Sequence, residues 1–288
     1  MTKAAADTQV AFSNKNSPDR NFFVLGLAII LALGAVALLT LVGTGKARGP
    51  LDDKQITQSL HNDSDPSGIV EALSEIQERM RHQQPVSQWY PELARLANSR
   101  DERIGQVVAD MMGQIPSRSD FHEVLLSMLR GRSLVVKNSA ALSLAEFGDG
   151  AGREQLLSML YPVRLTAPAS GRVETALSFG TRIEHGGLVA RLVNSGIATN
   201  IYSPISGQLR ALSAQEGDVL SAGSHVATIE PDTAQIIAVL HALELVGHTE
   251  DLPAIKAYEN ANASELRDHA IAADRAIRTR EGTGSPAS

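Results

Sequence analysis

The 288-residue chain has no cysteine, so disulfides, thiol catalysis and cysteine-ligated zinc are excluded. Aromatic residues make up only 4% of the chain, and the net charge is −6. Because nucleic-acid binding needs clustered Lys and Arg, this charge balance argues against nucleic acid as a partner. Lysine is absent from residues 138–255, so no group that requires a lysine amine can be attached there.

Charge is absent from residues 22–44, which read FFVLGLAIILALGAVALLTLVGT. About 20 apolar residues span a bilayer as a helix, whereas the apolar core of a signal peptide has about 7–15. We therefore expect a retained transmembrane helix, with a secretion signal as the alternative. The flanking Lys and Arg residues balance, so the positive-inside rule does not orient the helix. Since only the short tail 1–21 precedes it, we expect a single-pass protein of the bacterial inner membrane with a periplasmic body.

The rest of the chain contains a repeated helical pattern. The segment SLVVKNSAALSLAEFGD (133–149) has an apolar stripe at helical spacing, and its VKNSAA (136–141) aligns with LRDHAI (266–271). Weaker copies begin at Asp65 and Asp101, and a partner helix is expected before each copy. Paired helices at a spacing in the thirties resemble HEAT repeats, which bury their apolar faces by stacking on neighbours.

The spacing of the helix-ending glycines predicts an insertion. Gly113 and Gly148 are 35 residues apart, which is one repeat, but Gly148 and Gly247 are 99 apart. The excess has the size of a small domain and falls between two predicted helices at 152–160 and 233–247. We expect these helices to pair, so that the helical array folds without the insertion.

The inserted segment, 161–231, repeats internally. APASGRV (167–173) aligns with SPISGQL (203–209), and GTRIEHGGLVARL (180–192) aligns with GDVLSAGSHVATI (217–229). Short alternating segments broken by Gly and Pro favour β-strands. The doubled pattern resembles the biotinyl/lipoyl barrel-sandwich domain and the related hybrid domain of membrane fusion proteins.

The resemblance implies an acceptor lysine on the hairpin that joins the two halves, about eight residues before Pro204. That position is Gly196, within RLVNSGIATN. We therefore expect a scaffold without a cofactor, whose hairpin tip at Asn194, Ser195 and Gly196 contacts a partner. Membrane fusion proteins carry a long α-hairpin in this tip, and its absence here argues against a tripartite efflux role.

Other motifs do not predict a catalytic or metal site. His241, His248 and His269 lack the His-Glu-x-x-His pattern of a zinc site. The glycines of 148–152 lack the Lys-Ser/Thr ending of a phosphate loop and are typical of a turn between helices. Asp101 and Glu102 open a helix, where negative charge opposes the dipole. No Gly-x-Ser-x-Gly elbow is present.

The sequence thus predicts a multidomain α+β protein: one transmembrane helix, and a HEAT-like α-solenoid interrupted by an all-β barrel-sandwich hybrid domain. The predicted function is a membrane-anchored, non-enzymatic adaptor or scaffold that binds other proteins of an envelope transport or secretion assembly. The alternatives are an accessory docking subunit of a membrane-associated enzyme complex and, less favoured, a metal-dependent enzyme. Neither the partners nor the oligomeric state follow from the sequence. The predicted segments are a polar tail (1–21), the membrane helix (22–44), a linker (45–52), helical repeats (53–160), the insertion (161–231), resumed helices (232–280) and a disordered tail (281–288).

Overall fold

The computed structural model describes residues 50–282. In this range no helix is long and apolar enough to cross a membrane. The longest, α11 (Ser264–Gly282), carries charged side chains along its length, such as Asp268, Asp274 and Arg278. The single-pass fold class and the inner-membrane localisation are therefore corrected: the described chain is an α+β protein without a spanning helix. The apolar segment 22–44, from which they were predicted, lies outside the described residues.

Helices make up the two ends of the described chain, before and after a central β module. They occur as consecutive pairs, and the second helix of each pair is the longer. The first helices are α2 (Asp53–Leu60), α4 (Tyr90–Leu96), α6 (Ser119–Leu129), α8 (Arg153–Ser158) and α10 (Leu252–Lys256); the second are α3 (Pro66–Arg81), α5 (Glu102–Gly113), α7 (Leu134–Glu146), α9 (Thr233–Val246) and α11. Three short 3₁₀ turns precede first helices: η1 (Ser87–Trp89), η2 (Gly150–Gly152) and η3 (Thr249–Asp251).

Short polar side chains fix where the second helices begin. Asp65, Asp101, Ser133 and Asp232 each accept a hydrogen bond from a backbone N–H in the first turn of the following helix. Such caps satisfy donors that have no partner inside the helix.

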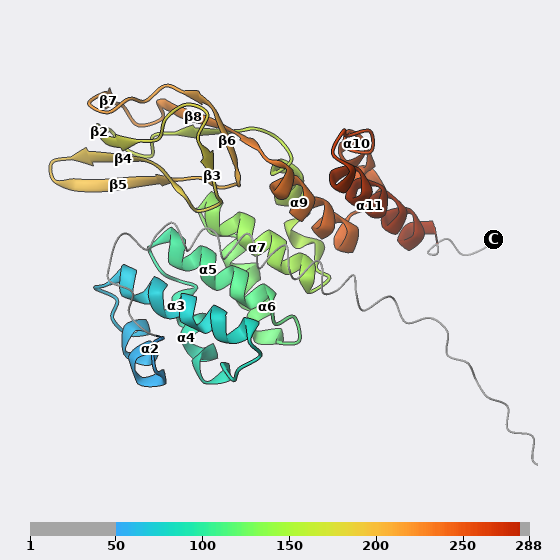
Figure 1. Cartoon of the computed structure of the whole chain (residues 1–288), viewed down its shortest axis with the longest axis horizontal. Helices are drawn as coiled ribbons and strands as arrows, with labels where there is room; N and C mark the ends of the chain where they lie inside the picture. Colours follow the sequence, from blue (N-terminus) through green and yellow to red (C-terminus); the bar gives the residue numbers. More distant parts are fainter. Residues whose placement is uncertain (1–49, 283–288) are drawn as a thin grey trace, which may run out of the picture.

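The helix pairs stack side by side, so that the second helices form a continuous row from α3 through α5, α7 and α9 to α11 (Figure 1). Small residues allow close approach within the stack. A Cβ on Gly152 would lie 2.7 Å from the Cβ of Ala141 in α7, and one on Gly113 of α5 would lie 2.7 Å from that of Ser143. The helix α7 lies at the centre of the row, and eight of its thirteen residues are buried.

The β module consists of eight strands in two antiparallel four-stranded sheets. One sheet has the order β1-β8-β6-β3 and the other β5-β4-β2-β7. The strands are β1 (Val163–Thr166), β2 (Gly171–Ala176), β3 (Arg182–Ile183), β4 (Leu188–Asn194), β5 (Ile197–Tyr202), β6 (Gly207–Leu212), β7 (Val219–Leu220) and β8 (His225–Pro231).

The strand order reflects the internal sequence repeat. The strands β1 to β4 of the first half correspond in order to β5 to β8 of the second half. If each strand is exchanged for its counterpart, the order β1-β8-β6-β3 becomes β5-β4-β2-β7, which is the order of the other sheet. The two halves therefore have the same fold and contribute two strands each to both sheets.

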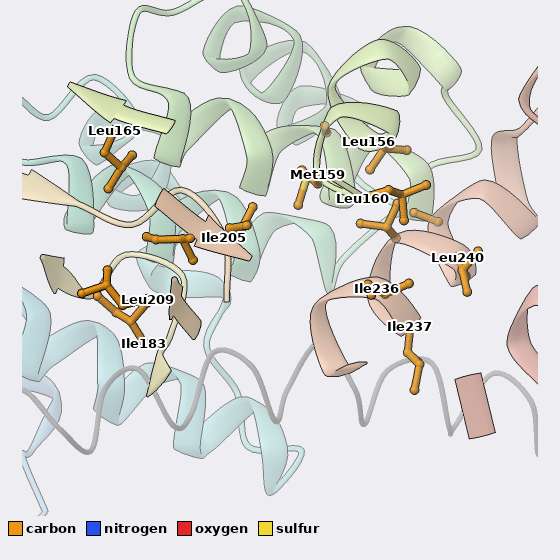
Figure 2. Packing of buried hydrophobic residues seen from close by; sticks show 14 of the residues in the cluster. Leu156, Met159, Leu160, Leu165, Ile183, Ile205, Leu209, Ile236, Ile237 and Leu240 are labelled. Carbon is orange, nitrogen blue, oxygen red and sulfur yellow. The ribbon is translucent and has the colours of Figure 1, made fainter. Parts of the chain in front are cut away.

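Two hydrophobic clusters hold the molecule together. One lies within the first three helix pairs and contains Trp89, Phe121 and their neighbours. The other is continuous from the inside of the β module to the last two helix pairs. In Figure 2, Leu165 and Leu209 represent the module in this second cluster, Leu160 follows α8, and Ile237 and Leu240 lie on α9.

Candidate functional site: a β hairpin on a stack of helices

The hairpin of β4 and β5 contains all three residues predicted to contact a partner. Asn194 ends β4 and pairs with Ile197, which begins β5. Ser195 and Gly196 connect the strands with φ angles of 51° and 80°. Two successive residues with positive φ are typical of a type I′ turn, which matches the twist of the flanking strands. The three residues are exposed at the end of the hairpin; their contact with a partner stays a prediction.

The position that the family resemblance assigns to an acceptor lysine is the glycine of this turn. A Cβ placed on Gly196 would meet no atom within 4 Å, so space alone would admit a larger residue. What favours glycine is the positive φ, which costs other L-residues roughly 1–2 kcal/mol.

The surroundings of the turn are uncharged and partly apolar. From residue 192 to residue 209 the chain has no charged side chain. Ile197 is 72% exposed, although an isoleucine side chain gains stability from burial. The turn and β5 therefore present backbone, amide groups and apolar carbon to solvent, whereas β4 carries one exposed charge, Arg191, paired with Glu174 at 2.8 Å.

A buried histidine anchors the module on the helices. His185, in the turn between β3 and β4, places its Nε2 2.9 Å from the carbonyl oxygen of Val135 at the start of α7. Because a carbonyl oxygen only accepts, Nε2 carries the proton of a neutral ring. Burial lowers the pKa of His185 to about 4, although the hydrogen bond to Val135 acts in the opposite direction. The ring is therefore neutral at pH 7.

Amide side chains make the remaining contacts of this junction. Asn138 of α7 donates to the carbonyl oxygen of Pro204 and accepts from Gln155 Nε2 at 2.6 Å. Gln235 of α9 accepts from the backbone N–H of Ser206 at 2.9 Å. The bonds to Pro204 and Ser206 join helix side chains to the backbone of the loop between β5 and β6, and the bond from Gln155 orients Asn138, so the loop keeps one position on the helix ends.

A carboxyl group lies beside this junction on α5. Asp110 is half-buried, and desolvation raises its pKa to about 7, while hydrogen bonding with Ser139 and Gln106 acts to lower it. The Nε2 of Gln106 also donates to the carbonyl oxygen of His185 at 3.3 Å. Gln106 therefore links the carboxyl group of the helix stack to the loop that carries the buried histidine.

Two adjoining hollows form a groove among the loops that connect the helices. They have volumes of 530 and 460 Å³ and share Asn98, Ser99 and Arg100. We call them together the loop groove, because the loops before α3, α5 and α7 line them. Those same helix ends carry the contacts to the module: Arg103 lies 5.7 Å from the ring centre of Tyr202 in β5, and Val135 binds His185. The groove therefore lies at the helix ends that also contact the module, although none of its lining residues belongs to the module. Its lining also includes Glu102, Glu123, Met128, Arg132 and Val136.

The three histidines considered as metal ligands do not converge. His241 of α9 lies 3.7 Å from Glu146 and 3.6 Å from Glu244, and these carboxylates raise its pKa against the effect of burial. His248 instead pairs with Glu281 at 2.9 Å, and burial lowers the pKa of His269. Between residues 50 and 282 no group of three or more metal-type ligands occurs.

The other two motifs have structural roles. Asp149, in the glycine-rich turn 148–152, accepts hydrogen bonds from the N–H of Ala151 and from His122. Asp101 caps α5 and forms an ion pair with Arg103 at 3.0 Å. Both motifs thus shape helix ends.

Sequence reasoning missed the junction residues. Gln106, Asn138 and His185 come from segments far apart in the chain, and the repeated segments that contain Asn138 and His185 were interpreted only as helix and strand patterns. The available signal was weak: Asn138 and Gln106 interrupt the apolar pattern of their helices at positions that would otherwise face the core.

Comparisons with known proteins add little to this geometry. No family model matches the chain, and no curated protein matches it in sequence. Among solved structures, a single-chain, multi-domain long-chain acyl-CoA carboxylase is similar over 53% of this chain, with 13% identity and a TM-score of 0.24. The match covers 17% of that protein's chain. A TM-score this low carries no inference about fold or activity.

Proposed function

We propose that this protein is a non-enzymatic adaptor that binds other proteins through the β4–β5 hairpin and the adjacent loop groove. The observation that carries the proposal is the exposure of an uncharged strand, β5, and its turn at the end of a module whose other end is fixed to the helices. Preorganised surfaces bind with less loss of conformational freedom, so a fixed hairpin suits recognition.

The arrangement of the helices supports the same function. Stacked helix pairs give extended surfaces in repeat proteins, and we propose that these pairs are HEAT-like. We likewise propose that the β module is of the biotinyl/lipoyl barrel-sandwich type, without the acceptor lysine. In this proposal the helices provide a rigid base, and the module supplies the part of the recognition surface that projects from it (Figure 1).

A crosslinking experiment tests the proposal. A photoreactive residue would replace Asn194 at the hairpin tip and, in a second variant, Glu123 in the groove. A third variant carries it at Arg278 on α11, away from both. If the protein is an adaptor, the first two variants capture the same partner in cells and the third does not.

The identity of the captured protein decides between two versions of the function. Subunits of one enzyme complex would favour the accessory docking subunit. Equal capture at all three positions, or no capture at Asn194 and Glu123, would contradict an adaptor that uses this surface.

A further inference from the structure

The four edge strands of the two sheets differ in how they are protected. Exposed edges invite pairing with other chains, and natural proteins shorten them, charge them or bend them. Here β3 and β7 have two residues each, and β3 includes Arg182. The third edge, β1, has four residues, carries Arg164 and has a register shift at Leu165/Thr166. Three edges are therefore short, or both charged and irregular.

The fourth edge, β5, has none of these features. It is six residues long, IATNIY, with no charge and no proline. The irregularity in its pairing with β4 lies on β4, between Leu188 and Ala190, at the base of the hairpin. Among the described strands, only β4 pairs with β5, so alternate residues of β5 present unpaired N–H and C=O groups on the other side.

We propose that β5 is a docking edge, at which an extended, uncharged segment of a partner protein adds as a fifth strand. This mode of recognition draws its affinity from main-chain hydrogen bonds. The proposal rests on the proposed function, since it names the part of the hairpin that the partner occupies and the chemistry of the occupant.

The lack of charged side chains along β5 indicates the chemistry of the segment that would bind there. Towards the hairpin tip, a segment paired with β5 would lie beside the uncharged stretch 192–209, where a charged side chain would lose water without gaining an opposite charge. At the other end of β5 the charge of Arg103 is already paired with Asp101. Apolar side chains, in contrast, gain contact with Ile197. We therefore expect a segment in which small or apolar residues alternate, without Asp, Glu, Lys or Arg over about six positions.

The position of β5 favours a single strand over a second copy of this chain. In Figure 1 it is the strand of its sheet nearest to α5, and the guanidinium group of Arg103 in α5 lies 5.7 Å from the ring centre of Tyr202. An added segment would thus run between the sheet and the helix ends, towards the loop groove. A second two-sheet module would have to enter the same space.

The test uses a peptide probe with the sequence of residues 196–203, GIATNIYS, acetylated, amidated and fluorescently labelled. This probe is uncharged and forms a strand in its own protein. We expect it to bind the full chain with a Kd in the range of about 10–500 µM, typical of small interfaces. A probe N-methylated at alternate residues loses main-chain donors and should bind at least tenfold more weakly.

Matched variants locate the binding on the protein. Ile197→Lys charges the β5 edge, and Val219→Lys charges the β7 edge at a residue with the same 72% exposure. The first should weaken probe binding at least tenfold, and the second should leave it unchanged. Equal binding of the methylated probe, equal effects of the two lysines, or no binding at about 1 mM would overturn the proposal.

A cysteine experiment tests whether a second copy of this chain occupies the β5 edge. Because the chain has no cysteine, Thr199→Cys introduces a single thiol at the middle of β5. Two copies paired about this residue would bring the thiols within disulfide range. Rapid oxidative dimers with Thr199→Cys, but not with Val219→Cys, would show that the edge binds another copy and would overturn the heterologous occupant; monomers support it.

This set of outcomes separates the inference from the proposed function. If a partner crosslinks at Asn194 but the probe fails, the adaptor function stands and strand addition is wrong. If the probe binds at β5 but no partner crosslinks, the edge is open and the adaptor function is wrong.

Discussion

Burial moves the pKa values of two residues at the junction in opposite directions. His185 has its pKa lowered to about 4, and Asp110 has its pKa raised to about 7. Both contact Gln106, yet each favours its neutral form because the folded protein replaces the water around it. At pH 7 the buried histidine of the junction is therefore neutral, and the carboxyl group beside it is about half protonated instead of fully ionised.

These shifts predict opposite pH dependences for two variants. The buried His185 adds stability above pH 6.5 that is lost as the pH falls towards 4, because the unfolded chain then binds the extra proton. Asp110 adds stability at about pH 4 that is lost as the pH rises through 7, because the folded chain holds the proton longer. Relative to the parent, His185→Gln should lose stability as the pH rises, and Asp110→Asn should gain it.

Urea unfolding of the parent and both variants between pH 4 and pH 8 measures these differences. One pKa unit corresponds to about 1.4 kcal/mol, so each difference should change by on the order of 2 kcal/mol over its window, reduced for Asp110 by its partial exposure. If the stability of each variant depended on pH in the same way as that of the parent, neither group would have a shifted pKa in the folded protein.

The lack of lysine predicts that the β module carries neither biotin nor lipoate. Both cofactors need a lysine amine, and residues 138–255 contain none. The intact mass of the protein from cells should equal that of the unmodified chain in this region. Streptavidin or anti-lipoyl reactivity that maps to residues 161–231 would contradict this expectation.

The turn between β3 and β4 is the element that fits most closely against the helices. Gly186 has a φ of 76°, and a Cβ placed on it would lie 1.8 Å from Oε1 of Gln106. Gly180, in the preceding loop, has a similar φ of 80° but open space around it. The two glycines therefore share a backbone requirement, and only one of them has a packing requirement as well.

Substitution with alanine separates the two requirements. Gly180→Ala should cost about 1 kcal/mol, because a non-glycine residue resists a positive φ. Gly186→Ala should cost about 1–3 kcal/mol more, because it displaces Gln106 from the carbonyl oxygen of His185. Thermal unfolding gives both values.

A double variant provides the control for this comparison. Once Gln106→Ala has removed the amide, adding Gly186→Ala should cost no more than Gly180→Ala does alone. A large remaining cost would mean that the strain lies in the backbone of the turn.

For the whole molecule, the structure predicts that the helices fold without the β module. The helices α8 and α9 lie together, with Leu156 and Leu243 in the same buried cluster. Much of the junction that deletion would expose is polar: Asn138, Gln155 and Gln235 would exchange protein hydrogen bonds for water.

The experiment measures the unfolding of a variant in which a short Gly-rich turn replaces residues 161–231. We expect helical circular dichroism and a single cooperative transition at a lower Tm, since Ile236 and Leu160 lose apolar contacts with the module. Loss of cooperative melting would show that α8 and α9 depend on the module for their pairing.

Local signals in the sequence were sufficient to predict much of this architecture. Residues 161–231 were expected to form β-strands, and the strands run from Val163 to Pro231. The helices expected at 152–160 and 233–247 correspond to α8 and α9, because capping residues and apolar periodicity act over a few positions.

The features that could not be predicted from the sequence depend on contacts between residues that are far apart in the chain. His185 and Val135 are 50 residues apart, and only the folded arrangement brings them together. The hairpin with its tip at Asn194, Ser195 and Gly196 was expected from the family resemblance, but the open edge of β5 was not, because it depends on the strand order of both sheets. The membrane prediction was overturned because it depended on apolar length in residues 22–44, and no helix of the described part has that character.

The path of the chain into and out of the β module determines how the protein responds to force. The chain enters at β1 and leaves at β8, and these strands pair directly, with Val163 opposite Ile229. A pull transmitted through the helices would therefore separate the two strands from one end, breaking one hydrogen bond after another instead of loading all of them at once. Under tension the module would open at its base, while the hairpin of β4 and β5 at the far end kept its shape.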